Sequence, residues 1–140
     1  TLSEKETREQ LIDPMLAAAG WGGGLIEEEH VYRPGKLRLL GEQTVRDAPQ
    51  YIDYVLRAEP RGMILAALEA KDEAHAPEAG LQQALAYAVD VNAPFAISSN
   101  GHEVVLQCME LVLLNGVRAF RARPTWSIVG ILATPGKDAK

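Results

Sequence analysis

One uninterrupted apolar run, Ile64-Leu65-Ala66-Ala67-Leu68, most constrains how this chain can fold, and it is followed directly by Glu69, Ala70 and Lys71. A strand with one face in water alternates apolar and polar residues, whereas a continuous apolar run is typical of a strand covered on both faces. The sequence therefore predicts a central strand over about residues 63–70. Charge at the end of such a strand has to be paired or ligated, because an isolated buried charge is strongly unfavourable. This end of the sheet is consequently the first candidate for a functional site.

The N-terminal segment carries two signals for the start of a helix. The stretch Ser3-Glu4-Lys5-Glu6 has the capping-box pattern. In this pattern the Ser3 hydroxyl accepts a hydrogen bond from the backbone N–H of Glu6, and the Glu6 side chain reaches back to the backbone N–H of Ser3. Asp13-Pro14 is a second start signal, with the aspartate as N-cap and the proline at the first helical position. We therefore expect a helix over about residues 4–11, a kink or restart, and a helix over about residues 14–19 that ends at Gly20.

Turn signals divide the next part of the chain into short strands and one further helix. Pro34-Gly35 ends the first strand, residues 58–62 are rich in turn formers, and Asn100-Gly101 strongly favours a hairpin. The resulting order of helix, three strands, helix and two strands predicts a single mixed α/β domain. Strands are expected over about residues 25–32, 51–56, 63–70, 95–98 and 103–106, and the helix over about residues 77–89.

Two segments have a less definite pattern. The charged stretch from Lys36 to Asp47 is expected to be partly extended. The C-terminal segment, residues 107–140, includes an apolar stretch from Met109 to Leu114 that fits either a helix or a strand. Residues 133–140 have the character of a frayed tail.

Length and cysteine content exclude several classes of protein. With 140 residues the chain has the length of about one domain. Its single cysteine, Cys108, excludes an internal disulfide framework, a four-cysteine zinc site and an iron–sulfur cluster. No apolar run approaches the roughly 18 residues that a membrane span needs, and the N-terminus lacks the apolar region of a signal peptide. We therefore expect a protein of the reducing cytoplasm without membrane contact.

The formal net charge of −5 argues on average against nucleic acid, which prefers basic partners. The charge is divided into blocks, however: −5 over residues 1–32, +2 over 33–61, −6 over 62–110 and +4 over 111–140. Basic groups of the second block are candidates for phosphate contacts with DNA. These candidates are Arg33, Lys36, Arg38, Arg46, Arg57 and Arg61. In the last block, Arg118, Arg121 and Arg123 either extend that surface or only keep an apolar segment soluble.

The residues with the most informative chemistry are Asp53, Glu69 and Lys71. Residues two apart on a strand share a face, so Glu69 and Lys71 project together, and an antiparallel hairpin would bring Asp53 to the same end of the sheet. Two carboxylates at one place repel each other unless a cation neutralises them, and hard oxygen ligands suit Mg²⁺ or Mn²⁺. With the lysine beside them, they form a candidate site for metal-assisted phosphodiester hydrolysis. The alternative is a solvated ion pair on a sheet face, worth less than about 1 kcal/mol.

A second candidate element lies on the helix expected over residues 77–89. Gln83 and Tyr87 are four residues apart and therefore share one helical face. An amide and a phenol in that position suit hydrogen bonding to a phosphate or the orientation of a water near Lys71. The alternative is an ordinary amphipathic helix with a half-buried tyrosine.

Taken together, the motifs resemble the N-terminal nuclease domain of the motor (R) subunits of type I restriction enzymes. The resemblance covers about residues 3–106, and we expect residues 107–140 to be a C-terminal extension that does not match the family, with a partly disordered tail. It implies a restriction-endonuclease-like core, with a central mixed β-sheet flanked by helices in the order αβββαβ. The motifs that carry the resemblance are Glu4-Lys5-Glu6-Thr7-Arg8, Leu11-Ile12-Asp13-Pro14, Ala19-Gly20-Trp21, Ile52-Asp53-Tyr54-Val55-Leu56, Leu68-Glu69-Ala70-Lys71, Gln83 to Tyr87, and Ser98-Ser99-Asn100-Gly101.

The family's domain is a PD-(D/E)xK nuclease with a RecB-like Gln-x-x-x-Tyr motif, and Ile52 stands here in place of the proline. The resemblance implies that Asp53 and Glu69 are metal ligands and that Lys71 is the catalytic lysine. It also implies a further glutamate ligand from the first helix. For this further ligand, Glu4 is the closest match and Glu6 is the alternative. The family's helical motif matches Gln83 and Tyr87, and the resemblance implies that these two residues help to position DNA or the lysine.

The resemblance implies a DNA endonuclease that depends on Mg²⁺ or Mn²⁺ and acts on double-stranded DNA. Its expected partners are methyltransferase and specificity subunits and an ATPase motor region that this chain does not contain. The stretch Gly130 to Lys137 is not an ATP site, because five residues instead of four separate its glycines and Asp138 replaces the Ser or Thr that holds Mg²⁺. One alternative function is a catalytically silent, nuclease-like module that docks a motor or methyltransferase partner. A weaker alternative is a stand-alone exonuclease or junction nuclease.

Overall fold

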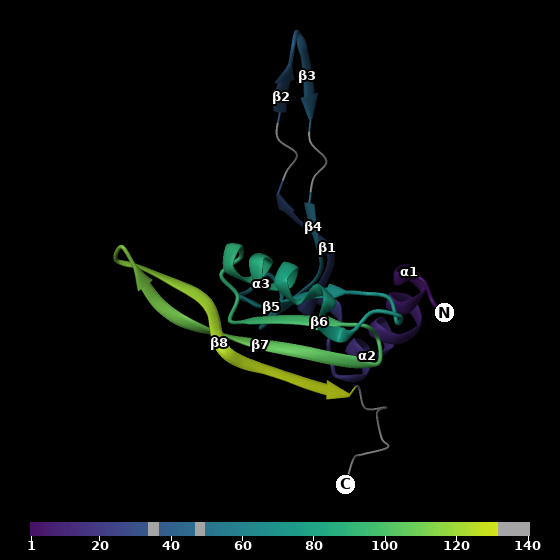
Figure 1. The fold of residues 1–140 in the computed structure, drawn as a ribbon. Helices are drawn as coiled ribbons and strands as arrows, with labels where there is room; N and C mark the ends of the chain where they lie inside the picture. The colour runs from purple at the N-terminus through teal and green to yellow at the C-terminus, as the bar shows by residue number, and fades with distance from the viewer. Residues whose placement is uncertain (34–36, 47–49, 132–140) are drawn as a thin grey trace.

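The computed structural model describes residues 1–33, 37–46 and 50–131. Its main feature is a curled six-stranded sheet with the strand order β1-β4-β5-β6-β7-β8, and β2 and β3 form a separate hairpin (Figure 1). Helices lie against this sheet, so the mixed α/β class predicted from the sequence is confirmed. The strands are β1 Ile26–Arg33, β2 Leu37–Leu40, β3 Gln43–Arg46, β4 Gln50–Arg57, β5 Ile64–Ala70, β6 Phe95–Ser99, β7 Glu103–Leu114 and β8 Val117–Ile131.

The apolar run forms β5, which lies inside the sheet between β4 and β6. Its residues from Ala66 to Ala70 are all buried, as the sequence predicted for a central strand. β5 pairs antiparallel with β4 and parallel with β6. A parallel pair needs a crossover connection, and here the chain crosses through the 3₁₀ helix Pro77–Gly80 and the helix α3, Leu81–Asp90. This crossover places α3 on one face of the sheet against β5 and β6, with Gly80, just before α3, beside Glu69 near the end of β5.

The N-terminal segment is one continuous helical stretch: α1 Glu4–Thr7, a π-helical turn Arg8–Ile12, and α2 Asp13–Ala18. The capping box of Ser3 and Glu6 is confirmed. The prediction of Asp13 as an N-cap is wrong, because its backbone is already helical and its carboxylate instead accepts a hydrogen bond from the hydroxyl of Tyr54. The π-helical turn ends at Ile12, two residues before Pro14, which lacks the N–H that a regular turn would need.

Two apolar clusters cover the two faces of the sheet. On one face α3 packs through Ala84, Tyr87 and Ala88 against β4, β5 and β6. On the other face Ile12 and Leu16 of the N-terminal helices pack against a second cluster, which includes the buried Tyr54. Figure 1 shows α3 and the N-terminal helices on either side of the central strands. The carboxyl end of β5 therefore lies between two helical layers.

The C-terminal part has more regular structure than the sequence suggested. β7 continues past residue 106 to Leu114 and pairs antiparallel with β8 through a turn at Asn115-Gly116, both in the left-handed conformation. The stretch 36–47, expected to be partly extended, contributes β2 and β3. The tail predicted over residues 133–140 lies outside the described residues. Within the described part of the chain, no helix has the length and apolar character to cross a membrane.

Candidate functional site

The β4–β5 hairpin brings Asp53 and Glu69 together at the carboxyl end of β5. The strands pair Tyr54 with Leu68, and continuing this register by one residue sets Asp53 opposite Glu69. The main-chain N–H of Ala70 donates a 2.9 Å hydrogen bond to Oδ2 of Asp53. The juxtaposition that the sequence predicted for these two carboxyl groups is therefore present.

Glu69 is a buried acid, with only 5% of its surface exposed. Its Oε2 is buried and has no hydrogen-bond partner among the described residues. Burial, followed by the negative charge of Asp53, raises the pKa of Glu69 to about 8, and the nearby Lys71 opposes this shift. A buried carboxyl group with an oxygen lacking a partner is costly to keep in a folded protein. Its environment therefore favours either a proton or a cation.

Gly80, the last residue of the 3₁₀ helix and the one directly before α3, packs directly on Glu69. A Cβ added at Gly80 would lie 2.8 Å from Cγ of Glu69 and 2.8 Å from Oγ of Ser98. The N–H of Gly80 donates a 3.1 Å hydrogen bond to the same Ser98 hydroxyl. Only a residue without a side chain allows this close approach, and it fixes the start of the helical crossover against the acid.

Lys71 and Glu4 are two further charged groups in the surroundings of the pair. Lys71 follows β5, and its N–H donates a 2.8 Å hydrogen bond to the carbonyl of Ser99 on β6. Glu4 comes from α1, and its pKa is raised by partial burial and then by the negative charge of Asp53, against the positive charge of Lys71. Glu6 is engaged in the capping box instead. Of the two glutamates considered from the sequence, Glu4 is the one in the electrostatic environment of Asp53.

The turn after β6 is joined by a hydrogen bond to the loop that follows Lys71. Asn100, which is 6% exposed, donates a 2.8 Å hydrogen bond from Nδ2 to the carbonyl of His75. Its Oδ1 accepts from the N–H groups of His102 and Glu103 at 3.0 and 2.9 Å. This arrangement gives a structural reason for the Ser98-Ser99-Asn100-Gly101 motif: it joins the β6–β7 turn to the loop beside the site.

Gln83 and Tyr87 lie on one face of α3, as their spacing predicted. The Gln83 amide donates a hydrogen bond to the hydroxyl of Tyr87. Tyr87 is 5% exposed, and burial raises its pKa, with a further contribution from the negative charges of Glu69 and Asp53, against the hydrogen bond from Gln83. The pair therefore lies within the electrostatic field of the two acids.

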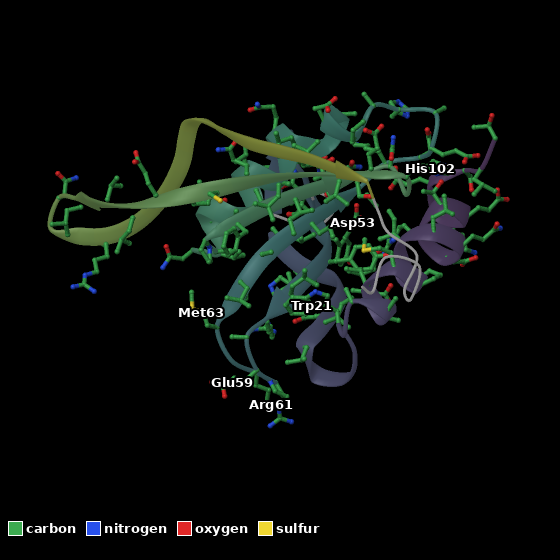
Figure 2. All side chains as sticks on the ribbon, turned by 90° about the horizontal axis from the view of Figure 1, so that it is seen from below. Trp21, Asp53, Glu59, Arg61, Met63 and His102 are labelled. Carbon is green, nitrogen blue, oxygen red and sulfur yellow. The ribbon has the colours of Figure 1, made fainter. Side chains whose placement is uncertain are left out.

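Of the basic residues proposed from the sequence as phosphate contacts, the two whose side chains the structure describes, Arg57 and Arg61, do not lie at this site. Arg57 lies at the other end of β4, where it bonds Glu27 and the carbonyl of Gly62, each at 2.9 Å. Arg61 is exposed in the β4–β5 turn, at the far end of the hairpin from Asp53 (Figure 2). For Arg33, Arg38 and Arg46 the structure describes only the backbone, and Lys36 lies outside the described residues.

Sequence reasoning assigned no role to Arg8, yet its guanidinium contacts the site. Its Nη1 lies 3.7 Å from Oδ1 of Asp53, and its Nε donates a 3.3 Å hydrogen bond to the hydroxyl of Tyr54. Arg8 is four residues after Glu4, so the two share one side of the N-terminal helix. That spacing is the signal from which the sequence could have indicated it. Both residues also line an open cleft of about 430 Å³ on the acidic side of the N-terminal helices.

The donor atoms present fit a hard divalent cation. Among the described residues, no group of three or more His, Cys, Asp or Glu side chains is arranged to hold a metal ion. Mg²⁺, however, is commonly held by one or two carboxylates and keeps several waters. Asp53 and Glu69 supply such a pair, and the partnerless Oε2 of Glu69 is an oxygen that a cation would satisfy.

Comparison with known proteins gives two relatives of one kind. No protein-family model matches the chain. The endonuclease subunit of the type I restriction enzyme EcoAI from Escherichia coli is 33% identical over 101 residues, which make up 71% of this chain and 12% of that subunit. A solved fragment assigned to an HsdR subunit of a type I restriction enzyme from Vibrio vulnificus YJ016 matches with a TM-score of 0.70 and 32% identity, over 75% of this chain and 21% of the other. The chain thus spans a small part of either relative, and both are of the kind that the sequence motifs predicted.

Proposed function

Because this chain is homologous to a segment of the endonuclease subunits of type I restriction enzymes, we propose that it is a metal-dependent nuclease domain that hydrolyses phosphodiester bonds in double-stranded DNA. The order and spacing of Asp53, Glu69 and Lys71 support a PD-(D/E)xK nuclease core. The observation that carries the proposal is the buried Oε2 of Glu69, which has no partner among the described residues and lies beside a second carboxylate.

Asp53 and Glu69 would hold a Mg²⁺ or Mn²⁺ ion, with Glu4 as a third carboxylate from the other side. When bound, such an ion neutralises charge on the scissile phosphate and makes water a stronger nucleophile. The protein's part is to hold both acids aligned, while a bound cation would favour the ionised form of Glu69 that burial opposes. The N–H of Ala70 donates a hydrogen bond to one carboxylate oxygen of Asp53, and the backbone of Gly80 packs closely against the Glu69 side chain.

Lys71 supplies a positive charge beside the two acids. Its ammonium lowers the pKa of Glu69 and of Glu4, so it interacts with both acids. A lysine in this position would orient the attacking water or offset negative charge that develops on the phosphate. Gln83 and Tyr87, joined by their hydrogen bond, would present an amide edge from α3 that aligns Lys71 or the DNA backbone.

Nicking of supercoiled plasmid DNA in Mg²⁺ or Mn²⁺ tests this function. We expect the 140-residue chain to convert supercoiled to open-circular DNA, and Asp53→Asn, Glu69→Gln and Lys71→Ala each to reduce the rate by at least about 100-fold. Glu59→Gln is the matched control, because Glu59 is an exposed acid in the turn at the other end of the β4–β5 hairpin (Figure 2). Equal nicking by the wild type and all three site variants would contradict the proposal.

The second candidate is a nuclease-like module that docks a motor or methyltransferase partner without cutting. One observation favours it: within the described residues, no three ligating side chains are arranged around a cation position. A titration with Mn²⁺ distinguishes the two functions, because a docking module has no reason to bind the ion through Asp53 and Glu69. In either case we propose that the chain works beside methyltransferase and specificity subunits and an ATPase motor region.

A further inference from the structure

Arg8 is enclosed between the N-terminal helices and the sheet, with 17% of its side chain exposed. Besides the 3.7 Å approach of Nη1 to Oδ1 of Asp53, its Nη2 donates a 3.4 Å hydrogen bond to the main-chain carbonyl of the same aspartate. One guanidinium therefore contacts both the side chain and the backbone of Asp53. With Ala70 on the other carboxylate oxygen, Asp53 is held from two sides.

Two residues of β1 hold Arg8 from its other side. The carboxylate of Glu29 accepts a hydrogen bond from Nη1, and that of Glu28 lies 3.9 Å from Nη2. The backbone of Glu29 has a φ of 54°, a left-handed conformation that few residues other than glycine adopt. Glu29 thus occupies an uncommon conformation where its carboxylate meets Arg8.

Tyr54 contacts the same guanidinium through both its ring and its hydroxyl. Its ring is fully buried, with its centroid 4.8 Å from the guanidinium carbon of Arg8, and its hydroxyl accepts from Nε and donates to Asp13. The chain Asp13–Tyr54–Arg8–Asp53 consequently joins α2, β4 and the π-helical turn. Tyr54 and Asp53 are adjacent on β4, so Arg8 is held against two neighbouring residues of the strand that carries the aspartate.

We propose that Arg8 is a positioning residue that fixes the carboxylate of Asp53 in the orientation needed to bind a divalent cation. The inference rests on the proposed function, because it deepens the role of the same acid pair. Arg8 acts through Asp53 and not on DNA, since its donors are directed to Asp53, Tyr54 and Glu29. Groups that orient metal ligands in this way typically contribute about 10- to 100-fold to metal affinity.

Geometry and charge make opposite predictions for this residue. A positive charge beside a cation site repels the cation, so the loss of charge alone would strengthen metal binding. A lysine keeps the charge but replaces the planar fork of donors by a single ammonium. If Arg8 positions Asp53, Arg8→Lys weakens metal binding although the charge is unchanged.

The test is a Mn²⁺ titration of the 140-residue chain, in which the electron paramagnetic resonance signal of free Mn²⁺ reports binding. We expect Arg8→Lys to weaken Mn²⁺ binding by about 10-fold. Tyr54→Phe removes the hydroxyl while keeping the buried ring, and we expect it to weaken binding by a smaller factor. Arg57→Lys is the matched control, because Arg57 is 18% exposed and also bonds a glutamate and a main-chain carbonyl, but at the other end of β4.

Thermal unfolding of each variant shows whether it is folded, and Tyr54→Phe decides the question if Arg8→Lys does not fold. Wild-type Mn²⁺ affinity in the folded variants, or tighter binding by Arg8→Lys, would overturn the positioning role and leave the proposed function intact. If the wild type does not bind Mn²⁺, or binds it equally well after Glu69→Gln, the proposed function and this inference both fail.

Discussion

The main-chain N–H of Ala70 donates its hydrogen bond to Oδ2 of Asp53 across 2.9 Å. Ala70 directly follows Glu69, so the bond sets the carboxyl groups of the two acids side by side. Its donor belongs to the backbone, and its position therefore depends on strand register and not on a particular side chain. A shift of the β4–β5 register by one residue would turn Asp53 to the opposite face of the sheet.

We predict that Gly80→Ala destabilises the protein by about 1–3 kcal/mol, because the added Cβ would lie 2.8 Å from Cγ of Glu69 and from Oγ of Ser98. The same contact would displace the Glu69 side chain, so metal-dependent nicking should also fall. Urea unfolding measures the first effect. Gly22→Ala is the control, since nothing lies within 4 Å of its added Cβ, and it should change stability by less than about 0.5 kcal/mol. Equal stability of both variants and the wild type would contradict the close packing.

Stability without metal should fall with rising pH because of Glu69. Its pKa is about 8 in the folded protein against an ordinary value of 4.5, so the native state binds more protons than the unfolded state between these values. The contribution of this group is therefore fully present below about pH 4.5 and is lost as the pH rises through about 8. Glu69→Gln cannot ionise and removes this loss.

Urea unfolding in EDTA at pH 5 and pH 8.5 measures the effect. We expect the stability of Glu69→Gln relative to the wild type to increase from the lower to the higher pH. Adding Mn²⁺ at pH 8.5 should then stabilise the wild type and leave the variant unchanged, because only the wild type offers the second carboxylate. A constant difference between the two proteins across this range would show that Glu69 is not a perturbed acid.

Tyr87→Phe separates the hydroxyl of this residue from its packing. The ring lies in the core against β4 and β5, so the variant should fold with a loss of at most about 1.5 kcal/mol. The Gln83 amide loses its acceptor, and we expect slower plasmid nicking with little change in Mn²⁺ affinity. Tyr51→Phe, at a tyrosine that is 42% exposed, is the control. If Tyr87→Phe nicks plasmid DNA at the wild-type rate, the Tyr87 hydroxyl has no role in the proposed site.

Asn100→Ala should destabilise the fold by about 1–3 kcal/mol, because it leaves the N–H groups of His102 and Glu103 and the carbonyl of His75 without their partner. Chemical denaturation measures this loss. Gln82→Ala removes an exposed amide on α3 and serves as the comparison. If both substitutions have the same small effect, the asparagine does not hold the loop after Lys71.

The central strand and its site were predictable because they depend on local pattern. The apolar run from Ile64 to Leu68 indicated burial on both faces, and the turn formers near residue 60 fixed which residues of the hairpin meet. From this register alone, Asp53 and Glu69 could be set opposite each other. The i,i+4 spacing of Gln83 and Tyr87 worked in the same way.

Features that depend on contacts distant in sequence were missed. Asp13 has the pattern of an N-cap, but Tyr54, 41 residues away, provides its partner. The spacing of Arg8 from Glu4 could place it on the same side of the helix, but no local pattern specifies its bonds to residues of β1 and β4. The β7–β8 hairpin is a different case, because Asn115-Gly116 is a type of turn signal that the sequence did offer, and the ambiguous period of residues 109–114 obscured it.

A crystal of the 140-residue chain soaked in Mn²⁺ tests the central claim most directly, because the anomalous signal of manganese locates the ion without reference to activity. We predict one peak between the carboxylates of Asp53 and Glu69, within about 2.0–2.4 Å of an oxygen of each, and no peak there in crystals of Glu69→Gln. The absence of a peak between these two acids in the wild type, or a peak only in the acidic cleft beside Glu9 and Glu28, would contradict the proposed site.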